Sequence, residues 1–128
     1  MAASYPDLQD RVVLVTGGGS GIGRAAALRF AKQDDKVLVT GRRPGPIEET
    51  IAGHANIAGL VADAASAEDA KRTIAKAVDI WGRVDALVNN AGAGAILPLE
   101  DTTSDRIMDI FSVNVLAQVC SLLPLFLT

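Results

Sequence analysis

Apolar positions in this chain gather in four short runs, and segments of helical character lie between them. The runs are rich in Val, Ile and Leu, and they cover residues 11–16, 37–40, 57–62 and 84–88. Short runs that are apolar throughout are typical of parallel strands buried on both faces. The intervening segments predict helices over about 21–33, 47–53 and 66–82. This alternation predicts an α/β fold with a parallel sheet and right-handed crossovers.

Turn and cap residues place the helix starts. Pro44-Gly45-Pro46 is expected to break the chain before the second helix. Ser66-Ala67-Glu68-Asp69 predicts a capping box for the third, and Thr102-Thr103-Ser104-Asp105 predicts one for a last helix that runs to the end. That last helix has an unusually broad apolar surface, so we expect it to be buried on several sides.

The last helix is not expected to cross a membrane. A span needs roughly 20 continuous apolar residues. The apolar run is interrupted by polar or helix-breaking residues, namely Asn114, Gln118, Ser121 and Pro124.

Composition sets further limits. A length of 128 residues leaves room for one domain, residues 1–128, and 49% hydrophobic with 21% charged residues fits a globular chain. The net charge of −3 gives no basic surface for nucleic acid. A single cysteine excludes an internal disulfide, and the N-terminal residues lack the features of a signal peptide. We therefore expect a cytoplasmic protein.

The first apolar run ends in a glycine-rich stretch, Thr16-Gly17-Gly18-Gly19-Ser20-Gly21-Ile22-Gly23, and an alanine-rich helix follows. The first amides of a helix lack partners and carry the positive end of its dipole, so such a loop suits a pyrophosphate. Gly17 is expected to make the turn, Gly21 to clear space for phosphate, and Gly23 to let the helix pack on the strand. No Lys-Ser/Thr pair follows, which excludes a P-loop; a plain tight turn is the alternative.

The spacing Gly17-x-x-x-Gly21-x-Gly23, led by Thr16, resembles the cofactor loop of the short-chain dehydrogenase/reductase family. A second match is Asn89-Asn90-Ala91-Gly92, directly after the fourth run. Side-chain amides of both asparagines can lock this strand end. The resemblance implies a doubly wound, Rossmann-type sheet of strand order 3-2-1-4. It also implies a set of cofactor-binding residues: Thr16, Gly17, Ser20, Gly21, Ile22, Gly23, Arg42, Arg43, Asp63, Asn90, Ala91 and Gly92.

The end of the second run indicates which cofactor is used. An acid here takes the ribose hydroxyls of NAD, whereas a nearby Arg accommodates the 2′-phosphate of NADP. Gly41 stands where the acid would be, and Arg42 offers a planar, permanently charged fork with Arg43 beside it. This predicts NADP(H), with NAD(H) possible; the alternative is a solvated basic loop. By resemblance Asp63 contacts the adenine, or else it only leads into a helix.

Asn114 is the candidate catalytic residue. It matches an Asn that, in the family, joins the catalytic group through a backbone distortion and a water-mediated proton relay; a locally bonded helix Asn is the alternative. The family's Ser, Tyr and Lys are not found, since the only tyrosine is Tyr5 and position 9 is Gln. The resemblance covers nearly the whole chain but only the first part of the family's domain.

These features predict the N-terminal, cofactor-binding portion of an NADP(H)-dependent oxidoreductase. The complete enzyme would transfer hydride between nicotinamide and a carbonyl or alcohol. The alternatives are a non-catalytic dinucleotide-binding or partner-docking module that regulates a full-length relative, and one half of a split enzyme. The fourth strand is expected to be an open edge, so self-association or a completing chain is expected through residues 104–127. No metal, nucleic-acid or membrane site is predicted.

Overall fold

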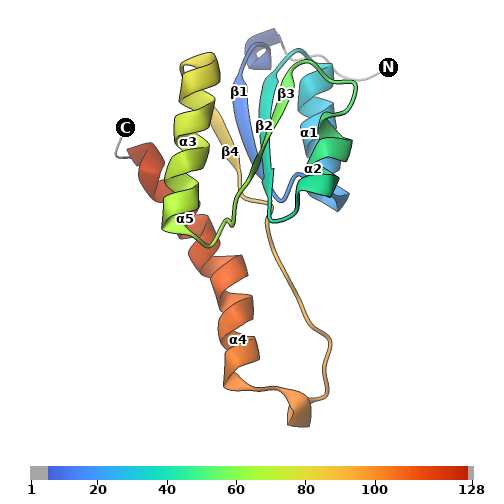
Figure 1. The fold of residues 1–128 in the computed structure, drawn as a ribbon, viewed down its shortest axis with the longest axis vertical. Helices are drawn as coiled ribbons and strands as arrows, with labels where there is room; N and C mark the ends of the chain where they lie inside the picture. The colour runs from blue at the N-terminus through green and yellow to red at the C-terminus, as the bar shows by residue number, and fades with distance from the viewer. Residues whose placement is uncertain (1–5, 127–128) are drawn as a thin grey trace.

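The computed structural model describes residues 6–126, which form a four-stranded parallel sheet of order β3-β2-β1-β4 (Figure 1). The strands are β1 (Val12–Thr16), β2 (Lys36–Gly41), β3 (Ile57–Val61) and β4 (Ala86–Val88). The predicted α/β class and strand order are confirmed. The register places Thr16 opposite Thr40 and Val15 opposite Val88, so β1, β2 and β4 end at one edge of the sheet. Tyr5 lies outside the described residues.

Helices cover both faces of the sheet. In chain order the helical segments are η1 (Pro6–Leu8), α1 (Gly21–Lys32), α2 (Pro44–Ile51), α3 (Ala67–Trp81), η2 (Leu99–Asp101), α4 (Ser104–Phe111), η3 (Ser112–Leu116) and α5 (Ala117–Phe126). Figure 1 shows α1 and α2 on one side of the sheet and α3 and α5 on the other. This is the doubly wound arrangement.

Alternation along β1 accounts for the two layers. Val13 and Val15 pack in a buried cluster with α1 and α2, whereas Val12 and Leu14 pack in a second cluster with α3. Successive side chains of a strand point to opposite faces, so both faces of a central strand must be apolar. The continuous apolar run in the sequence is the result of this double burial.

The helix starts differ in detail from the predictions. Pro44 and Pro46 lie inside the first turn of α2 instead of breaking the chain before it, because a proline there removes no helical hydrogen bond. At α3 the Ser66 hydroxyl accepts from the Asp69 amide as predicted, but the Asp69 carboxylate accepts from the Asp63 amide, so the box is only half formed. The cap of α4 is Thr103, whose hydroxyl accepts from the Arg106 amide.

The last helix is continuous but contains a π-helical segment, η3, in which the Ala117 amide donates to the Ser112 carbonyl oxygen. The expectation that this helix is buried on several sides is wrong. In the described part of the chain α5 packs on α3, but just 17% of an apolar 18-residue window within residues 104–126 is buried. Figure 1 shows α4 projecting beyond the end of the sheet. By length and composition alone, the helix Ser104–Phe126 could cross a membrane, so its assignment as a non-spanning helix stays a prediction.

Candidate cofactor-binding site

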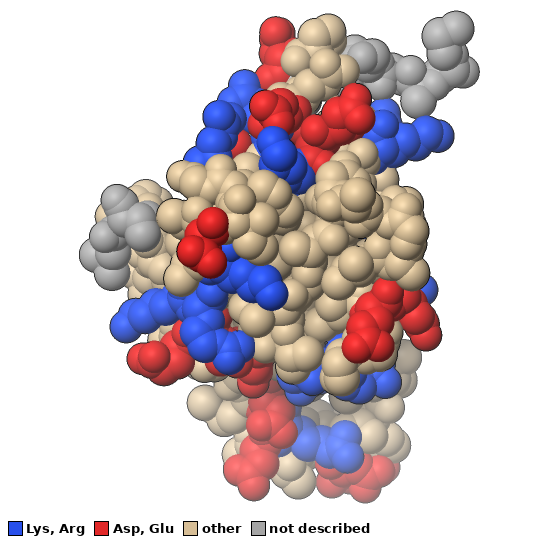
Figure 2. Space-filling view, turned by 45° about the horizontal axis from the view of Figure 1, so that its top comes forward, with Lys and Arg blue, Asp and Glu red and all other residues tan. Residues whose placement is uncertain are grey.

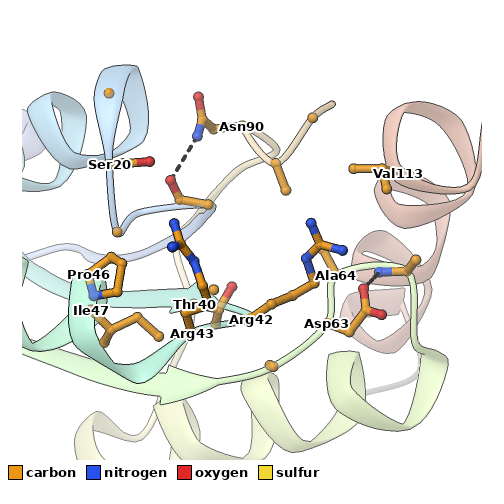
Figure 3. A pocket seen from close by; sticks show the side chains of 18 of the residues that line it. Ser20, Thr40, Arg42, Arg43, Pro46, Ile47, Asp63, Ala64, Asn90 and Val113 are labelled. Carbon is orange, nitrogen blue, oxygen red and sulfur yellow. Dashed lines mark hydrogen bonds between the residues drawn. The ribbon is translucent and has the colours of Figure 1, made fainter. Parts of the chain in front are cut away.

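A pocket of about 730 Å³ lies at the carboxyl ends of the strands (Figure 3). Ligands of open α/β sheets bind at this edge, and the volume falls within the range of small-molecule and cofactor pockets. All predicted cofactor residues except Thr16 and Gly23 line it. They are Gly17, Ser20, Gly21, Ile22, Arg42, Arg43, Asp63, Asn90, Ala91 and Gly92.

The glycine-rich loop has the conformation and open space expected for it. Gly17 has a φ of 67°, which confirms the predicted turn, and Gly21 has a φ of 54°. A Cβ at Gly21 would meet no atom within 4 Å, so the backbone there is open to a ligand. Gly23 acts differently from the prediction. Its Cβ would lie 2.2 Å from the Gly17 carbonyl oxygen, so this glycine lets α1 approach the loop itself.

Thr16 does not line the pocket, because its hydroxyl is used inside the fold. The side chain accepts hydrogen bonds from the main-chain amides of Asn90 (3.1 Å) and Ala91 (3.0 Å). It also donates to the Val88 carbonyl oxygen at 3.4 Å, and the residue is only 5% exposed. In the structure Thr16 joins the end of β1 to the segment after β4, and its assignment as a cofactor contact stays a prediction.

Asn90 locks the same junction from the other side. Its Nδ2 donates to the carbonyl oxygens of Thr16 and Gly17, each at 3.1 Å, which confirms the predicted lock. Asn89 does not share this role. Within residues 6–126 its buried Oδ1 has no hydrogen-bond partner. One asparagine of the motif therefore builds the site, and the other leaves an unsatisfied acceptor at the end of the edge strand.

Two arginines supply the positive charge of the pocket. Figure 3 shows the side chains of Arg42 and Arg43 extending from the end of β2 into the pocket. Both are exposed, and in the described part of the chain neither guanidinium has an ion-pair or hydrogen-bond partner. The neighbouring position 41 is a glycine, so no acidic side chain stands beside the arginines. The pair is thus available to an anion from outside the chain.

Asp63 fits both interpretations that the sequence left open. It lines the pocket, yet its carboxylate accepts a hydrogen bond from the Ala65 amide at 2.9 Å. Its own amide donates to Asp69 in the first turn of α3. The residue therefore shapes the lead-in to a helix and also presents a carboxylate at the edge of the pocket.

Asn114 lies in the π-helical segment, at the backbone distortion that the resemblance implies. Its Nδ2 donates to the carbonyl oxygens of Ala93 (2.6 Å) and Ile110 (2.9 Å), and its Oδ1 accepts from the Ala93 amide (3.3 Å). Asn114 does not line the pocket, although Val113 does. The bond to Ile110 is the local one expected of a helix Asn, whereas the two bonds to Ala93 hold the loop after β4 against the last helix.

Further lining residues were not singled out from the sequence. They are Gly19, Thr40, Gly41, Pro46, Ile47, Ala62, Ala64, Ala65 and Val113. Most of them lie at or shortly after the end of a strand. The meeting of parallel strand ends at one edge of the sheet was therefore the signal that could have found them.

Neither charge clusters nor metal ligands indicate a second site in the described residues. On the face in Figure 2, Lys and Arg side chains alternate with Asp and Glu around a broad uncharged surface. Within residues 6–126 no group of three or more His, Cys, Asp or Glu side chains could hold a metal ion.

Comparison with known proteins adds independent evidence. The model of the short chain dehydrogenase family matches residues 11–123. The uncharacterized oxidoreductase YvrD of Bacillus subtilis is 36% identical over 115 residues, which cover 88% of this chain and 43% of that protein. The cis-2,3-dihydrobiphenyl-2,3-diol dehydrogenase of Paraburkholderia xenovorans is 35% identical over 114 residues, which cover 84% of this chain and 41% of that protein.

A solved structure shows the same arrangement of elements. A short chain dehydrogenase from Mycobacterium smegmatis superposes with a TM-score of 0.87 at 28% identity, over 97% of this chain and 54% of that one. The chain thus spans less than half the length of the two curated relatives.

Proposed function

Because this chain belongs to the short-chain dehydrogenase family, we propose that it is the cofactor-binding portion of an oxidoreductase and that it prefers NADP(H) to NAD(H). The observation that carries the proposal is that two anion-binding features line the same pocket. The glycine-rich loop at the start of α1 lies on one side of it, and two unpaired arginines follow β2 on another. No acid stands at position 41 or beside it.

The residues present fit a dinucleotide. The open backbone at Gly21 and the start of α1 offer unpaired amides and the positive end of a helix dipole to a pyrophosphate. At Gly17 a Cβ would lie 3.1 Å from the Ala91 Cα, so only glycine keeps this junction closed. Arg42 would hold a 2′-phosphate with its planar fork, and Arg43 would add charge. When bound, the nicotinamide of the cofactor supplies or accepts the hydride.

Hydride transfer to a carbonyl or from an alcohol is our proposal for the whole protein. One relative is by name a diol dehydrogenase, which supports a substrate with an alcohol group. The family resemblance implies a Ser, a Tyr and a Lys that these 128 residues do not supply in matching positions. Asn114 is our candidate for a catalytic role in the proton relay. It is supported by the π-helical segment that holds it and by its bonds to Ala93 beside the pocket.

We further propose that the chain self-associates through the apolar surface of the last helix. Large apolar side chains there are each at least 40% exposed: Ile107, Met108, Phe111, Val115, Leu116, Val119, Leu122, Leu123 and Phe126. Monomeric soluble proteins rarely leave such a surface open to water.

Calorimetric titration with NADPH and NADH tests the cofactor assignment. We expect NADPH to bind about tenfold more tightly, which corresponds to roughly 1.4 kcal/mol and is within reach of one charge-assisted hydrogen bond. Arg42→Ala should bring the two dissociation constants close together. Arg106→Ala removes another exposed arginine, on α4, and should change neither of the two dissociation constants. Equal or tighter binding of NADH by the unmodified chain would overturn the preference for NADP(H).

A further inference from the structure

Arg24, the residue after the last glycine of the loop, connects three parts of the fold. Its Nε donates to the Thr50 hydroxyl at 3.1 Å, and its Nη2 donates to the Gly19 carbonyl oxygen at 2.5 Å. The same Nη2 lies 3.4 Å from the Pro46 carbonyl oxygen and 2.9 Å from the Glu49 carboxylate. One guanidinium on α1 thus bonds both the glycine-rich loop and α2.

Thr50 completes this connection from inside α2. The residue is 1% exposed, and its hydroxyl lies 2.9 Å from the Gly18 carbonyl oxygen and 3.1 Å from that of Pro46. A hydroxyl has one hydrogen to donate, and the shorter distance favours Gly18. The Thr50 hydroxyl therefore accepts from Arg24 and donates to Gly18, and so it joins α1 to the glycine-rich loop through α2.

The backbone of the loop lies so close to β2 and α2 that no side chain would fit between them. A Cβ at Gly18 would lie 2.6 Å from a Val39 methyl, and one at Gly19 would lie 2.9 Å from the Pro46 Cβ. The Gly18 amide also donates to the Thr40 carbonyl oxygen at 3.0 Å. Because these glycines bring no side chains that could interlock with β2 and α2, hydrogen bonds hold the loop in its position.

We propose that Arg24 and Thr50 are positioning residues that fix the spacing between the two anion-binding parts of the pocket. These parts are the loop of residues 17–21 and the Arg42–Arg43 pair. The pair lies between Gly41, the last residue of β2, and Pro44, the first residue of α2, so the position of α2 helps to set that of the arginines. This inference rests on the proposed function, because a dinucleotide phosphate is the ligand that would span both parts.

The distance between the loop and the arginine pair should affect the affinity of a ligand that binds both. It should not affect the affinity of a ligand that binds only one of them. NADPH carries a pyrophosphate and a 2′-phosphate, whereas adenosine 2′-monophosphate carries only the latter. Loosening the connection between loop and α2 should therefore cost affinity for NADPH, since its two anchors would no longer be held in register. The shorter ligand should not respond.

Calorimetry with both ligands on the full 128-residue chain tests this. Arg24→Met and Thr50→Val should each weaken NADPH binding by about tenfold and adenosine 2′-monophosphate binding by less than about twofold. Thr50→Ser keeps the hydroxyl and should retain NADPH affinity. Glu49→Gln removes only the ion pair to a carboxylate that is 70% exposed, and it should leave both ligands unchanged.

Hydrogen exchange in the free chain gives a readout that needs no ligand. The Gly18 amide, which donates to the Thr40 carbonyl oxygen, should exchange about tenfold faster in Arg24→Met and Thr50→Val, and at the unmodified rate in Glu49→Gln and Thr50→Ser. Equal losses for the two ligands, or unchanged NADPH binding, would overturn the positioning role alone. If the unmodified chain bound no dinucleotide, the proposed function would fail first, and the positioning role with it.

Discussion

Asn90 donates two hydrogen bonds to Thr16, one from its main chain and one from its side chain. The Asn90 amide donates to the Thr16 hydroxyl, and the Asn90 side-chain Nδ2 donates to the Thr16 carbonyl oxygen, both at 3.1 Å. These residues are 74 positions apart in the sequence and follow two neighbouring strands. The pair closes the edge of the sheet at which the pocket lies, and so it holds the glycine-rich loop beside Ala91.

Removing the Thr16 hydroxyl should destabilise the fold. Thr16→Val keeps the volume but leaves the amides of Asn90 and Ala91 without their acceptor. We expect the free energy of unfolding to fall by about 2 kcal/mol, measured by urea denaturation. Thr102→Val removes a hydroxyl whose hydrogen bond lies on the exposed surface, and we expect the free energy of unfolding to fall by about 0.5 kcal/mol or less. Similar losses in the two variants would contradict the role assigned to Thr16.

Asp85 should make stability depend on pH in the acid range. Its carboxylate accepts from Arg83 Nε at 2.7 Å and from the Val12 amide at 2.8 Å, next to the first residue pairs of β1 and β4. The hydrogen bond from Arg83, and after it the one from the Val12 amide, lowers the pKa of Asp85 below its usual 3.8. A carboxyl with a lowered pKa stabilises the fold above its unfolded value, and this contribution is lost as the pH falls through the folded value.

Asp85→Asn isolates that contribution. At pH 7 the variant should be less stable than the unmodified chain by about 1 kcal/mol, because the side chain is only partly shielded from water. The difference should shrink as the pH falls below 3.8 toward the lowered pKa of Asp85, because protonation removes the charge that the variant lacks. Asp10, whose pKa is lowered chiefly by its hydrogen bond to Lys36, titrates in both chains; the Asp85 charge raises the pKa of Asp10, but this is the weakest influence on it, so the contribution of Asp10 differs little between them. A difference that persists undiminished at pH 3 would argue against the charge as its source.

Particular residues show how far the sequence could lead. The strands were predictable because Val13 and Val15 face one layer and Val12 and Leu14 the other, so no polar position interrupts the run. The pocket was largely predictable because its charged and glycine residues follow strand ends. The inward turn of Thr16 was not, since its hydrogen-bond partners lie more than seventy residues away and a local pattern cannot show them.

The last helix shows a second limit of the sequence. Periodicity and composition predicted a helix, but they could not say which neighbour covers it, and most of its apolar side chains are exposed. Cys120, within this apolar helix, is only half-buried for the same reason. Only the resemblance at Asn114 indicated the π-helical segment, since hydrophobic periodicity does not show it; the segment accompanies the long-range bonds of Asn114 to Ala93. The cytoplasmic location stays a prediction.

Asn114 should hold the loop after β4 against the last helix. Asn114→Ala removes three hydrogen bonds, two of them to the backbone of Ala93. We expect a loss of about 1–2 kcal/mol in the free energy of unfolding and faster hydrogen exchange over residues 91–98. Gln118→Ala, at an exposed position one turn further along, should change neither. Unchanged exchange in that loop would show that Ala93 is held by other contacts.

The apolar surface of the last helix should drive self-association. Phe111 is 55% exposed and Leu123 is 54% exposed, and between them lie further exposed apolar residues. Burial of such side chains yields roughly 1.5–3 kcal/mol each when complete, so even partial burial against a second copy would favour an oligomer at micromolar concentration. Light scattering should show a mass that rises with concentration. The double variant Phe111→Glu, Leu123→Glu should remain a monomer, because pairing would bury its charges.

Ile96→Glu is the matched control for this experiment. Ile96 is fully exposed, at 103%, but it lies in the loop before η2 and outside the last helix. If the association were non-specific and hydrophobic, this variant would reduce it as well, since it also replaces an exposed apolar side chain by a charge. If the helix surface is the contact, Ile96→Glu should associate like the unmodified chain, and only the helix variant should lose the concentration dependence. A chain that stays monomeric at the highest attainable concentration would rule the contact out.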